Sequence, residues 1–197
     1  MTRTDATGFL EIAGDSAAAR RMFDHDVEQV GHVMNLSRVW AHQLELHSGL
    51  FELMNRAARA ASLSFRQRGV LVVACAATFG DAYCSLAWGK KLADVADGEL
   101  AGGVVRGDDS RLDATERALA GWARAMTRAP SSTVDADVAP LRAAGYDDAQ
   151  ILAISLFVAL RLAFAAVNDA LGVLPDRVLL DHAPEPVRAA VTYGRRG

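Results

Sequence analysis

The residues that could do chemistry gather around Cys84, which lies three positions after Asp81 and four before Trp88. Gly80 breaks the preceding helical pattern and Asp81 is a favourable N-cap, so a helix is expected to begin here with all three residues on one face. The N-terminal end of a helix carries about half a positive charge, which lowers the pKa of a thiol. Cys84 is therefore a candidate nucleophile, whose attack on a peroxide would give a sulfenic acid that an external thiol resolves.

The same three residues also have a structural interpretation. A carboxylate at Asp81 raises the pKa of the neighbouring Cys84 and offsets the charge of the helix end. The indole of Trp88 is a donor only and cannot shuttle a proton. In this interpretation Asp81 caps the helix, Cys84 packs as a small apolar side chain and Trp88 fills or lines a pocket. Cys75 lies among Val and Ala residues and is predicted to belong to the core.

Other kinds of site are not indicated. The five His residues show neither His-x-x-x-His spacing nor a Cys-His cluster, so no metal site is expected. No Gly-rich phosphate loop is evident, and no cofactor is predicted. Two Cys argue against a disulfide scaffold. The net charge of -3 gives no reason to expect nucleic acid as a partner.

Helical periodicity and capping residues predict the elements that position Cys84. Ser64 and Gln67 form a capping-box pattern that opens the helix before the Cys84 helix. No segment alternates between apolar and polar residues, so no sheet is predicted. A break is expected at 35–37 and one short helix in a loop-rich passage near 102–110. The remaining helices are predicted at about 20–34, 46–57, 65–78, 82–95, 114–128, 135–144 and 148–171.

Length and composition favour one helical domain. The chain has 197 residues, half of them hydrophobic, which suits a single domain with a sizeable core. The most apolar stretch, 151–167, contains Arg161, and a central Arg in a membrane costs about 2.5–3.5 kcal/mol on insertion scales. We therefore expect a buried or subunit-facing helix here and no membrane partner. The first residues lack the apolar run of a secretory signal, so a cytoplasmic location is the default expectation.

The stretch from Thr78 to Gly89 resembles the Cys-x-x-Cys-x-x-x-His signature of the alkylhydroperoxidase D-like (carboxymuconolactone decarboxylase) superfamily. Further segments are similar to other parts of that family, in the family's order and spacing, over roughly 33–176. They are 35–42, 63–68, 142–151 and 169–173, the last resembling the peroxidase-related branch. The resemblance implies an all-α, single-domain helical bundle of the alkylhydroperoxidase D-like type. On this basis we expect one domain over 1–197, with a helical core at 20–176 and a C-terminal extension at 177–197.

The resemblance also implies a chemistry from which this chain departs. Active members reduce peroxides with a Cys pair and a Glu–His proton relay, or decarboxylate a muconolactone. Here Asp81 stands at the first Cys position, Cys84 at the second and Trp88 at the His position. The relay Glu falls near Gly69. Of these four positions only Cys84 matches.

The family also has a pocket between helices, often near a subunit boundary. By that resemblance Tyr83, Trp40 and His42 are the candidates to lie near it. Their structural alternatives are packing for the two aromatic residues and a surface position for His42. The resemblance further implies a homo-oligomer, as a dimer, trimer or hexamer.

Three functions are left open by the sequence. The first is a divergent, weak thiol oxidoreductase that acts on peroxides through Cys84 alone. The second is a catalytically inactive member of the family that binds a small molecule or interacts with a partner. The third is cofactor-free decarboxylation or isomerisation of a lactone or acid, with Asp81 or a His as base. Whether the protein is an enzyme stays open among them.

Overall fold

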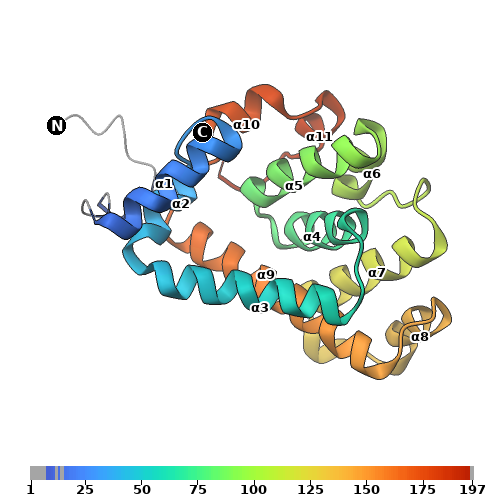
Figure 1. Cartoon of the computed structure of the whole chain (residues 1–197). Coiled ribbons are helices and arrows are strands. Elements are labelled where there is room, and N and C mark those ends of the chain that lie inside the picture. The colour runs from blue at the N-terminus through green and yellow to red at the C-terminus, as the bar shows by residue number, and fades with distance from the viewer. Residues whose placement is uncertain (1–7, 12, 14–15, 196–197) are drawn as a thin grey trace.

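The computed structural model describes residues 8–11, 13 and 16–195, and over these residues the chain is helical with no strand (Figure 1). The predicted all-α class is therefore confirmed. In chain order the helices are α1 (Ala17–Val30), α2 (Asn35–Trp40), α3 (Leu44–Ala60), α4 (Phe65–Phe79), α5 (Ala82–Val95), α6 (Gly98–Arg106), α7 (Ala114–Arg128), α8 (Asp135–Ala143), α9 (Asp148–Ala170), α10 (Arg177–His182) and α11 (Glu185–Ala190), with short 3-10 helices η2 (Ala41–Gln43) and η3 (Pro130–Ser132).

The bundle is built around α4, which packs against α5, α6, α7 and α9. Every residue from 69 to 76 on this helix is buried, so α4 is apolar on all sides, as a central helix must be. Its start has the predicted capping box between Ser64 and Gln67. Its end is fixed by Gly80, whose φ of 89° is a left-handed conformation that suits a residue without a Cβ. The chain then turns directly into α5.

Helix α9 lies along the bundle beside α3 and packs also against α4 and α7 (Figure 1). Among the described helices α9 alone is long and apolar enough to cross a membrane, by length and composition. In the structure Ile154, Phe157 and Val158 on this helix are buried in the core. Arg161 is buried as well, on the same helix. The apolar character of α9 therefore has a packing role within the bundle.

The N-terminal helix ends earlier than predicted, and the predicted break at 35–37 is wrong because this segment is part of α2. Helix α1 ends at Val30 because Gly31 has a φ of 82° and caps it. The backbone N–H of Asn35 donates to Oδ1 of Asp176 at 2.8 Å. That carboxylate satisfies a free amide at the start of α2, which allows the helix to form there.

The predicted C-terminal extension is described as far as Arg195, and helix α11 packs against α5 and α6. Val187 is fully buried, and a Cβ added to Gly102 would lie 2.6 Å from the carbonyl oxygen of Pro186. Further along, the hydroxyl of Tyr193 donates to Oγ of Ser85 at 2.9 Å. The segment after 176 therefore packs on α5 and α6 as part of the bundle.

Candidate functional site

The first turn of α5 has the predicted N-cap. Oδ1 of Asp81 accepts a hydrogen bond from the backbone N–H of Cys84 at 3.0 Å. Asp81 is fully buried, and burial is the main cause that raises the pKa of its carboxyl group. Asp81 thus caps the N-terminus of α5 and does not line the cavity beside Cys84.

Cys84 is a buried thiol with little tendency to ionise. Burial raises its pKa well above the usual value, and the nearby Asp81 carboxylate raises it further. The positive charge of Arg161 acts in the opposite direction and is the smaller effect. Burial also raises the pKa of Cys75, to about 11. At neutral pH both cysteines are therefore protonated thiols, and the nucleophilic form is scarce.

Trp88 offers an aromatic face in place of a proton relay. The guanidinium carbon of Arg161 lies 4.9 Å from the centre of its ring, and Nζ of Lys91 lies 5.0 Å from it. Both contacts are in the range of cation–π attraction.

Gly69 stands near the position where the resemblance expects the relay Glu. A Cβ at Gly69 would lie 3.2 Å from Cδ1 of Leu92, so α4 and α5 approach closely there. Gly69 itself supplies no carboxylate.

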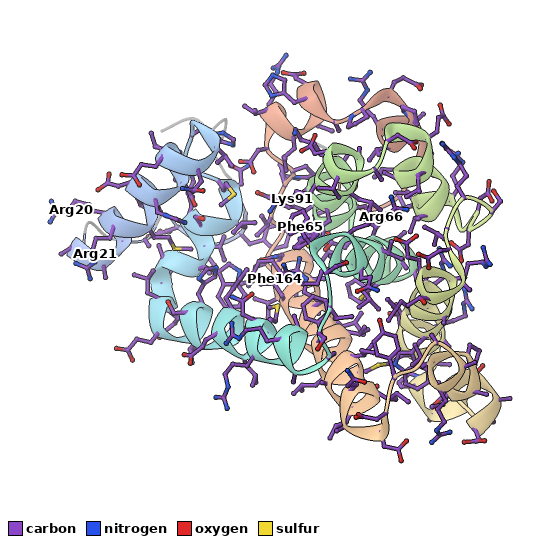
Figure 2. The ribbon with its side chains drawn as sticks, turned by 45° about the vertical axis from the view of Figure 1, so that its right-hand side comes forward. Arg20, Arg21, Phe65, Arg66, Lys91 and Phe164 are labelled. Atoms are coloured by element: carbon purple, nitrogen blue, oxygen red, sulfur yellow. The ribbon has the colours of Figure 1, made fainter. Side chains whose placement is uncertain are left out.

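A central cavity of about 680 Å³ lies between α1, α2 and α3 on one side and α5, α9 and α10 on the other. Cys84, Trp88 and Tyr83 line it, so three of the predicted site residues share one wall. Figure 2 shows Lys91 and Phe164, two further lining residues, in the middle of the molecule. The cavity is large enough for a small organic ligand.

Two predicted pocket residues lie elsewhere. Trp40 stands behind the cavity wall, with its ring stacked on Phe164 at 5.3 Å and its indole N–H donated to Oδ1 of Asn168 at 2.8 Å. His42 does not line the central cavity and has the surface position that was its structural alternative. Helix η2 turns its side chain outward, where Nε2 lies 2.8 Å from the carbonyl oxygen of Glu11.

The imidazole that lines the central cavity is His47, which was not predicted as a site residue. It lies on α3, five residues after His42, and its ring centre is 4.4 Å from that of Phe51. Burial lowers its pKa, so it is a neutral ring at pH 7. The amphipathic pattern of the segment from Leu46 onward was the available signal, because a residue on the apolar side of α3 faces the body of the protein.

Arg161 was also missed as a site residue. Its side chain lines the central cavity although the residue is only 6% exposed. The signal in the sequence was a single cation within the most apolar segment of the chain.

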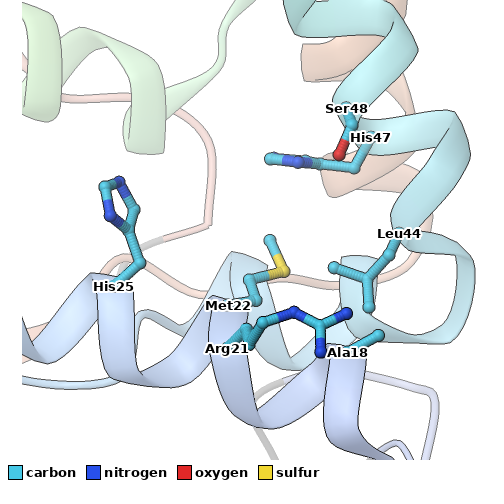
Figure 3. Close-up of a pocket in the computed structure, with 7 residues that line it drawn as sticks. All are labelled: Ala18, Arg21, Met22, His25, Leu44, His47 and Ser48. Carbon is cyan, nitrogen blue, oxygen red and sulfur yellow. The ribbon is translucent and has the colours of Figure 1, made fainter.

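A smaller groove of about 360 Å³ adjoins the central cavity between α1 and α3 and shares Met22, His25 and His47 with it. Figure 3 shows His25 on α1 and His47 on α3 at its two sides, with Arg21 below them. Across the described ranges of the chain, no three His, Cys, Asp or Glu side chains are placed to hold a metal ion. The side chains that line the site are therefore aromatic, imidazole and charged groups of both signs, without a metal-binding cluster among them.

Comparisons with known proteins agree with this architecture. No protein-family model matches the sequence, and no curated protein matches it either. The structure is similar to an uncharacterized peroxidase-related protein from a Silicibacter species, with a TM-score of 0.77 and 23% identity over 91% of this chain and 97% of that one.

The structure is also similar to an alkylhydroperoxidase AhpD core protein from Ralstonia eutropha, itself described as uncharacterized and peroxidase-related. The TM-score is 0.74, with 19% identity over 88% of this chain and 94% of that one. Both similarities extend over nearly the whole described bundle. The chain therefore has the all-helical fold of the alkylhydroperoxidase D-like superfamily.

Proposed function

We propose that this protein binds a small organic molecule in the central cavity and has lost the peroxidase chemistry of its fold. The observation that carries this proposal is the position of Trp88. It stands where the resemblance expects a His, yet it lines an open cavity of about 680 Å³ and does not fill it. Because Trp88 cannot transfer a proton and the cavity beside it is open, the site favours ligand binding over proton transfer.

The binding proposal predicts that filling the central cavity abolishes ligand uptake. Ala87 is half-buried in the cavity wall, so Ala87→Phe should place a ring in the ligand space. The measurement is the ligand-induced rise in melting temperature across a panel of small organic compounds. Ala143→Phe, at an exposed position on α8, is the matched control and should behave like wild type. Compounds that stabilise wild type and Ala87→Phe equally would contradict the proposal.

A single-Cys thiol oxidoreductase is the second candidate, favoured by the position of Cys84 in the wall of the same cavity. The raised pKa of this thiol weighs against it, and Cys75, the other thiol, does not line the cavity. Peroxide turnover with an external thiol, compared between wild type and Cys84→Ala, distinguishes the two functions. The binding proposal expects no turnover in either protein and unchanged ligand binding in Cys84→Ala.

Acid–base chemistry on a lactone or acid has less support. Asp81, the predicted base, caps the N-terminus of α5 and does not line the central cavity. His47 is in the wall, but burial lowers its pKa and makes it a weaker base than a free imidazole.

A further inference from the structure

Arg161 is a buried positive charge without an ion-pair partner among the described residues, and the buried Asp81 acts on it only at longer range. A guanidinium remains protonated in proteins, and burial only lowers its pKa somewhat. Among the described residues no carboxylate forms an ion pair with it. Its Nη1 donates to the sulfur of Met54 at 3.6 Å, and its buried Nε has no hydrogen-bond partner. A buried cation left in this state is costly unless an anion joins it.

The acids that line the central cavity do not supply that anion, because each is engaged elsewhere. Asp26 accepts the backbone N–H of Met34 at 3.0 Å. Asp94 pairs with Lys90 at 2.7 Å. The third acid is Asp176, which caps α2 and also accepts the hydroxyl of Tyr83.

Lys91 adds a second positive charge near the same place. It shares the Trp88 ring with Arg161, and its pKa is lowered first by burial and then by the charge of Arg161. Two cations next to one another repel, and an anion between them would remove that repulsion. The positive end of the cavity is thus formed by α5 and α9 together.

The part of the cavity wall next to this charge is aromatic. Phe164 lies 5.8 Å from the Arg161 guanidinium, and Phe51 meets Phe164 edge to face with ring centres 5.2 Å apart. Met34 and Leu36 continue the wall on the other side. Such a surface next to a cation suits the hydrocarbon or aromatic body of a ligand.

We propose that the ligand of the central cavity is a small organic acid, with its carboxylate paired with Arg161 and its apolar body against Trp88, Phe51 and Phe164. This inference rests on the proposal that the cavity binds a small molecule. The planar fork of a guanidinium matches the two oxygens of a carboxylate, which makes this pairing specific as well as strong. Lys91 contributes a second, more solvated charge at the same end.

The test compares acids with their neutral amides, which have nearly the same shape. Benzoate, cinnamate and octanoate are titrated against wild type by calorimetry, next to benzamide, cinnamamide and octanamide. Because a charged hydrogen bond in a buried site is strong, at least one acid should bind on the order of tenfold to a hundredfold more tightly than its amide. This comparison needs no variant, so it stands even if a substitution at Arg161 perturbs folding.

Two variants assign the effect to Arg161. Arg161→Met keeps the length of the side chain in an apolar setting and should reduce the affinity of the acid to that of its amide, with the amide unchanged. Arg59→Met, at an exposed position on α3, is the matched control and should bind like wild type.

The possible outcomes separate the two proposals. Acids that bind more tightly than amides in wild type, and lose that preference in Arg161→Met, support the organic-acid ligand. If acids and amides bind equally and Ala87→Phe blocks both, the acid inference is overturned while small-molecule binding stands. If no acid or amide binds, both proposals fail.

Discussion

The thiol, phenol and imidazole side chains around Cys84 are held in their uncharged forms. Burial is the first cause in each case: it raises the pKa of Cys84 and Tyr83 and lowers that of His47. A site of this kind has a low effective dielectric, which weakens ionisation and strengthens each remaining charge interaction. Arg161 is the exception because a guanidinium does not lose its proton. Arg161 is thus a permanent positive charge beside these neutral side chains.

Removing the charge of Asp81 should make Cys84 more reactive. Asp81→Asn keeps an oxygen that can accept the Cys84 N–H but has no negative charge, so the pKa of the thiol should fall. The measurement is the alkylation rate of Cys84 against pH, in a Cys75→Ser background. Asp81→Ala is the matched variant that also removes the cap, and it should lose about 1 kcal/mol of folding stability. An alkylation profile unchanged in Asp81→Asn would contradict the assigned influence of this carboxylate.

Asp169 gives a pH dependence whose sign follows from its environment. Burial and then the charge of Asp81 raise its pKa from 3.8 to about 6. Because the folded-state pKa lies above the unfolded one, this group stabilises the fold below about pH 4, and the contribution is lost as pH rises through about 6. Asp169→Asn should therefore raise the melting temperature at about pH 8 relative to wild type and change it little at about pH 4. Asp24→Asn, on the exposed side of α1, is the control, and an equal effect at both pH values would contradict the expectation.

At the scale of elements, α11 packs closely on α5 and α6 at positions where glycines carry no side chain. A Cβ on Gly89 would lie 2.5 Å from Cγ1 of Val187, and one on Gly102 would meet the backbone of Pro186. The glycines thus allow a six-residue helix to approach two larger ones at close range. The position of α11 depends on this fit because so short a helix has little stability of its own and is held by packing.

Two glycine-to-alanine variants test this fit. Gly102→Ala should destabilise the fold by about 1–3 kcal/mol, because the new Cβ collides with backbone that cannot move without displacing α11. Gly121→Ala, within α7, meets nothing within 4 Å and should stabilise the protein by about 0.5–1 kcal/mol through helix propensity. Chemical denaturation of both variants gives the comparison. A Gly102→Ala protein as stable as Gly121→Ala would show that α11 is not closely fitted.

The same elements show how far the sequence could be interpreted. Local signals predicted the helices around the site, because the caps Ser64 and Asp81 act on residues three positions away. Helix α2 was missed because its start is satisfied by Asp176, 141 residues further along the chain. No local pattern contains such a partner. Gly31, which ends α1, is a local signal, but the helical periodicity that continues to residue 34 obscured it.

The candidate site could likewise be predicted from the sequence only in part. Cys84 and Trp88 were placed on one helix face by spacing alone, and both line the central cavity. His42 was assigned by resemblance, but the direction of its side chain depends on the tertiary path of η2. Arg161 lines the cavity from α9, a helix far away in sequence. Its role follows from which helices meet around it, and that is a property of the assembled bundle.

At the scale of the whole molecule, α9 exposes apolar side chains on the side that faces away from the core. Leu152 is 71% exposed, Leu156 39% and Val167 38%. Ala163 and Ala166 are exposed on the same helix, and no charged residue interrupts this face. An apolar face of this extent suits burial against another surface.

We predict that copies of the chain assemble through this face of α9. A double variant, Leu152→Glu with Leu156→Glu, should dissociate the assembly, because it places charges in a contact that excludes water. Sedimentation velocity at micromolar concentration measures the change. Val134→Glu, an exposed apolar residue outside α9, is the control and should sediment like wild type. A wild-type protein that sediments as a monomer would contradict the prediction.

The hydrogen bond between Tyr193 and Ser85 has a consequence for how the protein is made. The two residues are 108 positions apart, so the first turn of α5 reaches the ribosome exit long before the segment that covers it. Nascent chains fold from the N-terminal side, and distant contacts form last. During synthesis the start of α5 therefore lacks this contact until the segment that contains Tyr193 has emerged.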